Sequence, residues 1–271
     1  METILLLTGC INPNRMSFTK LTDVNERKMQ YVDAIHYYLN ETNNKIIFCE
    51  NSNTSIHSFF NNDKDRIEIL CFSGNQDNQK GKGYGEAEII KYAFQYSNWL
   101  KGNQIVVKIT GRLIISNIRQ IIQSLKFKHN IITCRIHSDL RFADSRIICS
   151  TTSFYMDFLK NRNHIDDSKG VYFEQVLCDT ILNSPIPFIP FAEEPIIYGI
   201  SGTTGEKYQI PIQDYRHKIL YKRYSFEQLL KIYKISCRRK LNIFVRFIIW
   251  IKLLKYRLLS VVTIFMNHCS Q

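Results

Sequence analysis

The 271-residue chain lacks most of the short motifs that would assign a function directly. Its eight cysteines show no C-x-x-C spacing and its seven histidines show no metal-ligand spacing, so a zinc site is not expected. It contains no G-x-x-x-x-G-K-S/T, G-x-G-x-x-G or G-x-S-x-G sequence. The sequence therefore gives no reason to propose a P-loop protein, a dinucleotide-binding protein or a serine hydrolase.

Segments that would take the chain into or across a membrane are also lacking. Met1 to Leu7 has no basic n-region and too few apolar residues for a signal peptide. No uncharged apolar run approaches the ~20 residues needed to span a bilayer. The scattered cysteines, several of them within apolar runs, are typical of reduced, buried thiols. We therefore expect a cytoplasmic protein.

Acidic residues are scarce toward the end of the chain. The formal net charge is +12, and Glu227 is the only acid between Lys218 and Arg257. Such an excess would fit a nucleic acid, a membrane surface or an anionic substrate, so the positions of the cations have to decide. The excess is largely a property of a separate tail, which we place at residues 221–271.

What the chain does contain is a regular alternation of strand and helix patterns. Apolar strand-like runs occur at residues 3–8, 45–49, 67–72, 105–109 and 130–136, and helical patterns at residues 23–39, 86–100 and 116–125. Strands that alternate with helices imply β-α-β units and a parallel sheet. We predict an α/β fold with a mainly parallel sheet flanked by helices, in one domain over residues 1–220.

The most informative stretch is Gln104 to Arg112, an apolar strand that runs into a cationic turn. Lys108, Thr110 and Arg112 crowd its carboxyl end, and ligands of open α/β sheets bind at the carboxyl ends of the strands. Two cations and a hydroxyl without a carboxylate suit a phosphate or a diphosphate. A solvated turn is the alternative.

Polar residues also stand near the ends of the other strands: Thr8, Arg27, Glu50, Asn51, Lys82 and Gly83. The last two belong to the glycine-rich segment Lys80 to Gly85, which precedes a predicted helix. Its backbone N–H groups could approach a phosphate at the positive end of that helix. A plain flexible loop is equally consistent with the G-x-G-x-G spacing.

The order of these motifs resembles that of bacterial glycosyltransferases from capsule and lipopolysaccharide O-antigen clusters. The segments that carry the resemblance lie within residues 1–210: Thr8-Gly-Cys-Ile11, Arg27 with Tyr31, Phe48-Cys-Glu-Asn-Ser52, Gly81-Lys-Gly-Tyr-Gly-Glu86 and Lys108-Ile-Thr-Gly-Arg112. The resemblance implies a GT-A-like architecture with a nucleotide-sugar-binding half over residues 1–125 and an acceptor-binding half over residues 126–220. Contacts to the donor and its diphosphate are then expected from Thr8, Arg27, Glu50, Asn51, Lys82, Gly83, Lys108, Thr110 and Arg112.

The chain departs from this family at the usual metal site. GT-A enzymes usually end the fourth strand with Asp-x-Asp, whose carboxylates hold a divalent ion, whereas here the strand ends in Thr110-Gly-Arg112. Fixed cations can neutralise a leaving diphosphate in place of a metal. We therefore expect metal-independent transfer without a cofactor. The one literal Asp-x-Asp, Asp63-Lys-Asp65, is expected to be a solvated turn.

The second half offers two candidate catalytic carboxylates. Glu174 is flanked by aromatic residues, and apolar surroundings raise the pKa of a carboxyl toward the range of a useful general base. Asp144 is the second candidate, and Arg146 beside it could contact the acceptor. The alternatives are a helix cap or a structural pairing for Glu174, and a surface ion pair between Asp144 and Arg146.

Ser201 and Thr203 lie in the glycine-rich segment Gly199 to Tyr208. Glycines and hydroxyl side chains suit a lid over the cleft or a loop that contacts a sugar. A simple hairpin turn is the alternative.

The tail contains a strongly apolar stretch at residues 241–266 that Arg246, Lys252, Lys255 and Arg257 interrupt. With Trp250 as an interfacial anchor, residues 238–266 read as a helix that lies in an anionic membrane surface. A dimerisation helix and a buried C-terminal helix are the alternatives.

These observations favour a glycosyltransferase that moves a sugar from a nucleotide sugar to a lipid-linked or oligosaccharide acceptor. It would work at the inner face of the cell membrane in surface polysaccharide synthesis. A nucleotidyltransferase is disfavoured because it would need carboxylates for metal. A nucleic-acid-binding protein is disfavoured because the cations of the tail alternate with aliphatic residues rather than with stacking aromatics.

Overall fold

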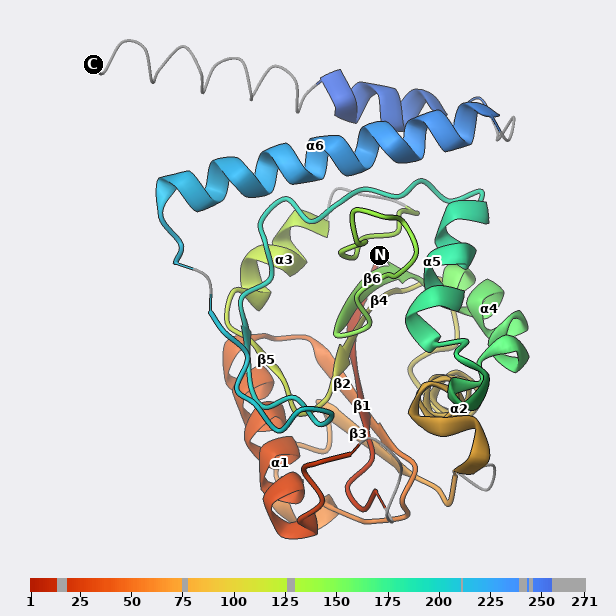
Figure 1. The fold of residues 1–271 in the computed structure, drawn as a ribbon. Helices are drawn as coiled ribbons and strands as arrows, with labels where there is room; N and C mark the ends of the chain where they lie inside the picture. Colours follow the sequence, from red (N-terminus) through yellow and green to blue (C-terminus); the bar gives the residue numbers. More distant parts are fainter. Residues whose placement is uncertain are drawn as a thin grey trace.

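The computed structural model describes residues 1–13, 19–74, 78–125, 130–210, 212–238, 243 and 246–254. Its centre is a five-stranded sheet in the order β3-β2-β1-β4-β6 (Figure 1). The first four strands in chain order are parallel and the last is antiparallel to β4: β1 Thr3–Gly9, β2 Lys45–Glu50, β3 Ile67–Cys71, β4 Ile105–Thr110 and β6 Ile147–Thr151. The prediction of an α/β fold with a mainly parallel sheet is confirmed.

Helices cover both faces of this sheet because its central strand is apolar on both sides. In β1, Ile4 and Leu6 belong to one buried cluster, and Leu5 and Leu7 belong to the other. A strand that is buried on both faces reads as a continuous apolar run rather than an alternating one. The two clusters place the hydrophobic core on either side of the sheet.

The helices divide between the two faces (Figure 1). One face carries α1 Val24–Glu41 and α3 Ile118–Leu125, and the other carries α2 Gly81–Tyr96, α4 Thr152–Lys160 and α5 Phe173–Asn183. Asp23 caps α1, where its side chain accepts a hydrogen bond from the backbone N–H of Glu26 at 2.7 Å. Short elements fill the connections: β5 Ile114–Ile115, β7 Ile197–Tyr198, η1 His57–Phe60, η2 Asn78–Lys80, η3 Arg162–His164 and η4 Asp167–Lys169.

Two predicted elements differ from the structure. Residues 130–136 form no strand and make only isolated bridges, one of which joins Thr133 to Cys149 of β6. The helix predicted from Glu86 begins at Gly81 instead, after the 3₁₀ turn η2. The glycine-rich segment is therefore the first turn of α2 rather than an open loop.

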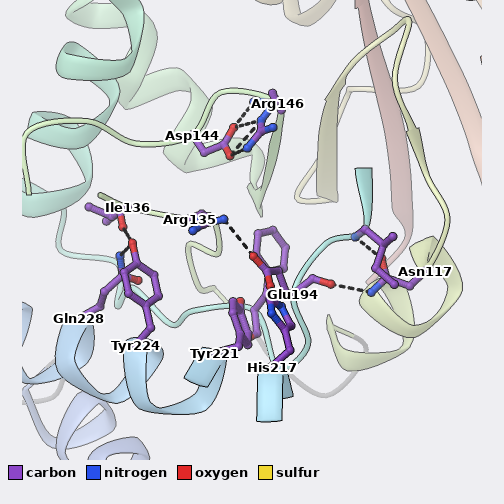
Figure 2. Close-up of polar contacts among 12 residues, drawn as sticks. Asn117, Arg135, Ile136, Asp144, Arg146, Glu194, His217, Tyr221, Tyr224 and Gln228 are labelled. Carbon is purple, nitrogen blue, oxygen red and sulfur yellow. Dashed lines mark hydrogen bonds and ion pairs between the residues drawn. The ribbon is translucent and has the colours of Figure 1, made fainter. Parts of the chain in front are cut away.

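The expected domain boundary at residue 220 falls inside α6 Tyr215–Arg238, which continues through it. α6 buries Leu229 and Ile232 in the same cluster as α2 and α5, and it makes polar contacts with the domain (Figure 2). Glu194 receives a hydrogen bond of 2.9 Å from Arg135 and contacts His217 of α6 at 2.5 Å. α6 is thus part of the folded domain.

Residues 246–254 form a helix alongside α6 (Figure 1). This helix buries Ile249 and Leu253 in the core cluster that also holds Leu229. Residues 239–242, 244–245 and 255–266 of the tail expected to contact a membrane lie outside the described residues. Among the described residues, no helix has the length and apolar character needed to cross a membrane.

Candidate functional site

A cleft of about 740 Å³ opens at the carboxyl ends of β1 and β4, where open α/β sheets bind their ligands. It draws side chains from α1, α2, α5 and the connections of the second half. Of the residues predicted from the sequence, all but Glu50 and Lys108 line it: Thr8, Arg27, Asn51, Lys82, Gly83, Thr110, Arg112, Asp144, Arg146, Glu174, Ser201 and Thr203. The structure thus brings together segments that lie up to 195 residues apart.

Parallel register and two glycines align the strand ends. Thr8 pairs with Thr110 in the ladder between β1 and β4, and the backbone N–H of Gly111 donates to the carbonyl of Thr8 at 2.8 Å. A Cβ atom on Gly111 would lie 2.8 Å from that carbonyl oxygen, and one on Gly9 would lie 2.7 Å from the Phe48 ring. Both positions therefore require glycine for close approach.

Arg27 of α1 is a buried cation at the rim of the cleft. Only 5% of it is exposed. Its Nε donates to the carbonyls of Cys10 and Ile11 at 3.1 Å each, and its Nη1 donates to the carbonyl of Leu21 at 3.1 Å. No carboxylate among the described residues pairs with it. Within the described part of the chain, carbonyl dipoles balance its positive charge, which favours an anion nearby.

Arg112, just after β4, also has no carboxylate partner within the described part of the chain. Its Nη1 donates to Gln30 Oε1 at 3.1 Å and to the carbonyl of Ile200 at 3.0 Å, while its buried Nε has no partner among the described residues. A Cβ atom on Gly202 would lie 2.7 Å from Arg112 Nη2 and 3.9 Å from Arg27 Nη1. The two guanidinium groups therefore converge on one loop.

Lys108 does not line the cleft as expected. It is fully buried, where its ammonium pairs with the Glu86 carboxylate and donates to the carbonyl of Ser145 at 2.7 Å. Thr8 Oγ1 also donates to Glu86 Oε1 at 2.7 Å. The Lys108 side chain is thus held by Glu86, which itself lines the cleft, and Lys108 is not placed to contact a donor.

Glu50 is likewise buried beneath the cleft and shapes the turn after β2. Its carboxylate accepts hydrogen bonds from the backbone N–H and the hydroxyl of Ser52 at 2.9 and 2.6 Å, and from the backbone N–H of Thr54 at 2.5 Å. Burial raises the pKa of Glu50, and these hydrogen bonds oppose that rise. The turn places the buried Asn51 at the cleft, where its Oδ1 has no partner among the described residues.

The start of α2 is occupied by a carboxylate. Asp167 Oδ2, in η4, accepts a hydrogen bond from the backbone N–H of Gly83 at 3.0 Å. Gly81 has φ +84°, and a Cβ atom there would lie 2.5 Å from Asp167. Burial raises the pKa of Asp167, while the hydrogen bond from Gly83 and the charge of Lys82 oppose that rise. The expected phosphate loop is therefore a capped helix terminus in this form of the chain.

Segment Gly199 to Tyr208 folds as a hairpin along the cleft. Ile200 and Lys207 form an antiparallel bridge, the carbonyl of Gly202 accepts from the backbone N–H of Lys20 at 3.0 Å, and Thr203 Oγ1 accepts from Lys82 Nζ at 2.8 Å. The hairpin alternative describes this segment, and Ser201 and Thr203 face the cleft from it.

Lys82, which contacts this hairpin, has a perturbed pKa. Desolvation lowers the pKa of Lys82, while the charges of Asp167 and Glu174 oppose that effect.

The two candidate carboxylates have different surroundings. Asp144 is paired with Arg146, whose Nε lies 2.9 Å from Asp144 Oδ1 and 3.1 Å from Oδ2 (Figure 2). Burial opposes ionisation of Asp144, but the hydrogen bonds and charge of Arg146 outweigh it and hold the pKa of Asp144 below its ordinary value. A carboxylate so paired is a poor proton acceptor, so the ion-pair alternative describes Asp144.

Glu174 lies in the first turn of α5 and is partly exposed to the cleft. Its Oε1 accepts a hydrogen bond from Ser145 Oγ at 2.7 Å, and no described residue bonds Oε2. Asp144 binds Arg146 through both oxygens and Glu86 pairs with Lys108, whereas Glu174 Oε2 and Asp167 Oδ1 have no partner among the described residues. The Asp167 oxygen is buried, while Glu174 is partly exposed to the cleft.

The sequence did not reveal several residues that line the cleft: Glu86, His137, Phe142, Asp167, Tyr172 and Tyr208. Most lie in connections without a recognisable motif, so no pattern in the sequence singles them out.

The described residues hold no group of three or more His, Cys, Asp or Glu side chains that could bind a metal ion. The cation Arg112 follows β4, and its guanidinium has no lone pair to offer a metal. The residues present therefore do not fit a divalent ion at this strand end.

No family model and no curated protein matches the chain. Solved structures with a partial likeness include a provisionally assigned nucleotide-diphospho-sugar transferase from Desulfovibrio desulfuricans G20, with TM-score 0.45, 12% identity, and coverage of 70% of this chain and 80% of that one. Another is the galactosyltransferase LgtC with donor and acceptor sugar analogues, with TM-score 0.40, 7% identity, and coverage of 66% and 69%. The bifunctional glycosyltransferase WbbM has TM-score 0.33, 8% identity, and coverage of 59% and 34%. Likenesses this weak leave the function to be argued from the site itself.

Proposed function

We propose that the chain is a glycosyltransferase that moves a sugar from a nucleotide-sugar donor to a hydroxyl of a glycan or lipid-linked acceptor. The observation that carries the proposal is the pair Arg27 and Arg112. Both guanidinium groups line a cleft at the carboxyl ends of parallel strands without a carboxylate partner among the described residues. A diphosphate supplies the charge that this pair lacks.

In the proposed reaction, the acceptor oxygen forms a bond to the anomeric carbon while the bond from that carbon to the diphosphate oxygen breaks. The leaving diphosphate takes the electron pair, and Arg27, Arg112 and Lys82 stabilise its charge. Fixed donors of this kind are worth ~10²–10³ in rate each. Glu174 takes the proton of the acceptor hydroxyl if the displacement inverts the anomeric carbon. A retaining reaction would make no such demand on Glu174.

Association with an anionic membrane surface is part of the proposal. The helix at residues 246–254 exposes Phe247, Trp250, Ile251 and Leu254, and the rings of Phe247 and Trp250 stack at 6.2 Å. Nearby α6 carries exposed lysines, among them Lys222 and Lys234. An apolar face beside cations suits the interface of an anionic bilayer. The enzyme would then work in surface polysaccharide synthesis as a cytoplasmic protein attached to the inner face of the membrane.

Thermal unfolding across a panel of nucleoside diphosphates and nucleotide sugars tests the proposal. A ligand at 100 times its Kd stabilises a protein by ~2.7 kcal/mol, so the matching donor raises the Tm clearly. Release of nucleoside diphosphate on transfer marks a glycosyltransferase, whereas release of pyrophosphate marks a nucleotidyltransferase. A Tm shift with DNA or RNA that falls with salt, in place of one with nucleotides, would overturn the proposal in favour of a nucleic-acid-binding protein.

A further inference from the structure

We infer that the part of the cleft lined by residues 137–145 and 172–174 is an acceptor subsite for an uncharged sugar ring, with Tyr172 as its stacking platform. The inference rests on the proposed function and adds the chemical class of the acceptor. It comes from three features of the second half: exposed aromatic rings, paired charges and a rigid support.

The first wall of this subsite is a hairpin over residues 136–143. Ile136 and Ala143 form an antiparallel bridge, and the backbone N–H of His137 donates to the carbonyl of Phe142 at 2.8 Å. The rings of His137 and Phe142 lie 5.9 Å apart, and both line the cleft.

The second wall is the start of α5. The backbone N–H of Ala143 donates to the carbonyl of Glu174 at 3.0 Å, which joins the hairpin to the residue proposed as the base. Tyr172 stands two positions earlier and lines the same cleft. Its side chain is 45% exposed, and no described residue forms a hydrogen bond with its hydroxyl.

Exposed rings and a hydroxyl beside a carboxylate match the chemistry of a sugar. One face of a pyranose presents C–H groups, which are attracted to the negative face of an aromatic ring. A sugar ring seated on Tyr172 would also bring its hydroxyls close to Glu174, whose Oε2 is available to accept a proton. Proximity of this kind is what the transfer step requires.

The charges at this end favour an uncharged ring. Arg146 is held by Asp144 through two oxygens, and its guanidinium lies 4.9 Å from the centre of the Tyr208 ring. An anionic sugar would therefore meet a cation that is already neutralised, together with the negative charge of Glu174. Lys82, the other cation whose charge reaches Glu174, is bound to Thr203 Oγ1. The cationic end of the cleft suits the diphosphate, and this end suits a neutral ring.

α6 holds the hairpin in place from behind (Figure 2). The Tyr224 hydroxyl donates to the carbonyl of Ile136, and Lys231 Nζ donates to the carbonyl of Ser138 at 2.7 Å. A wall braced in this way presents its rings in a fixed position, which is what a binding subsite needs.

The test compares Tyr172→Ala and Tyr172→Phe with the control Tyr198→Ala. Tyr198 is 42% exposed, close to the exposure of Tyr172, but it lies on β7 outside the cleft. Saturation-transfer NMR on the full chain would use methyl β-D-galactoside, methyl β-D-glucoside and the anionic methyl β-D-glucuronide. We expect signals from at least one neutral glycoside with the wild type, Tyr172→Phe and Tyr198→Ala, and loss of those signals with Tyr172→Ala.

Kinetics provide the second measurement, with the nucleotide sugar that gives the largest Tm shift. Tyr172→Ala should raise the KM for the acceptor by on the order of tenfold, which corresponds to ~1.4 kcal/mol, and leave the Tm shift with the donor unchanged. Tyr172→Phe should restore the KM.

The outcomes separate the subsite from the proposed function. If the wild type binds nucleotide and transfers sugar but Tyr172→Ala leaves acceptor KM and saturation transfer unchanged, the subsite is wrong. It is equally wrong if the glucuronide binds as well as the neutral glycosides, or if no neutral glycoside binds. If the wild type neither binds nucleotides nor transfers sugar, the proposed function itself fails.

Discussion

The backbone N–H of Gly83 donates a 3.0 Å hydrogen bond to Asp167 Oδ2, a residue 84 positions later in the chain. This bond puts a carboxylate where a helix N-terminus would otherwise attract a phosphate. It also joins α2 of the first half to η4 of the second half, next to Lys82. The start of α2 therefore stabilises the fold around the cleft, independently of any contact with a ligand.

Gly83→Ala should destabilise the protein. An added Cβ would lie 2.7 Å from Asp167 Oδ1 and 3.1 Å from the backbone nitrogen of Phe173, and overpacking of this kind costs about 1–3 kcal/mol. That outweighs the ~0.5–1 kcal/mol that alanine gains over glycine within a helix. Urea denaturation would measure the change in the free energy of unfolding. Gly102→Ala is the control, because a Cβ there meets nothing closer than 3.5 Å; equal stability of the two variants would contradict the packing at Asp167.

Arg112→Ala should weaken binding of the nucleotide donor and slow transfer by on the order of 10², the scale of losing one preorganised electrostatic contact. Isothermal titration with the donor and initial rates of transfer measure the two effects. Arg119→Ala is the matched control, because Arg119 is an exposed arginine of α3 that pairs with Glu41. Unchanged donor affinity and turnover in Arg112→Ala would remove Arg112 from the donor site.

Transfer should persist in an excess of chelator. The reason is that Arg27, Arg112 and Lys82 are placed to neutralise the diphosphate without a divalent ion. The measurement is the initial rate with EDTA, compared with rates after addition of manganese or magnesium. Loss of activity in EDTA that manganese restores would reveal a metal site built from other carboxylates.

Asp144→Asn should lower stability at neutral pH but not in acid. Burial opposes the charge of Asp144, yet Arg146 holds its pKa below the ordinary value. A depressed pKa means that the unfolded chain binds the proton first, so this stabilisation is present above about pH 4 and disappears as the pH falls further. Urea denaturation of both proteins from pH 7 to pH 3 should show their difference shrinking in acid. A difference independent of pH would contradict the ionised pair.

Replacing Phe247 and Trp250 by glutamate should abolish binding to vesicles that contain phosphatidylglycerol. Both side chains are about half exposed, so the change should leave the fold and nucleotide binding intact, while two carboxylates would be repelled by anionic lipid. Vesicle flotation and a Tm shift with donor provide the two readouts. Tyr198→Glu serves as the exposed control, and undiminished flotation of the double variant would place the membrane contact elsewhere.

The strands and helices of the first half were predictable because each central element repeats a strong local pattern. Ile4 to Leu7 of β1 are an uninterrupted apolar run and β4 is apolar except for Lys108 and its last residue, Thr110. The polar residues after both strands point to one edge of the sheet. Residues 130–136 are as apolar as a strand, yet they join the sheet only through the bridge from Thr133 to Cys149 of β6. How far an apolar segment pairs with a neighbouring strand depends on tertiary packing, which local sequence does not record.

The positions of the cleft residues were predictable, but their partners were not. Lys108 and Arg112 have the same charge and lie four residues apart, but one is buried against Glu86 and the other faces the cleft. That Glu86 pairs with Lys108 and Asp167 with Gly83 follows only from the three-dimensional arrangement of α2 and η4. Tyr172 is one exposed tyrosine among several, and only its place beside Glu174 distinguishes it.

The support that α6 gives to the 136–143 hairpin has a consequence for biosynthesis. Ile136 and Tyr224 are separated by 88 residues, and Ser138 and Lys231 are separated by 93. At ~5–20 residues per second, the ribosome makes the hairpin about 4 to 19 seconds before the helix that braces it. During that interval the nascent chain can form its parallel strands, while the hairpin still lacks its contacts with α6. The order of translation therefore leaves the 136–143 wall of the cleft without its support until α6 has been made.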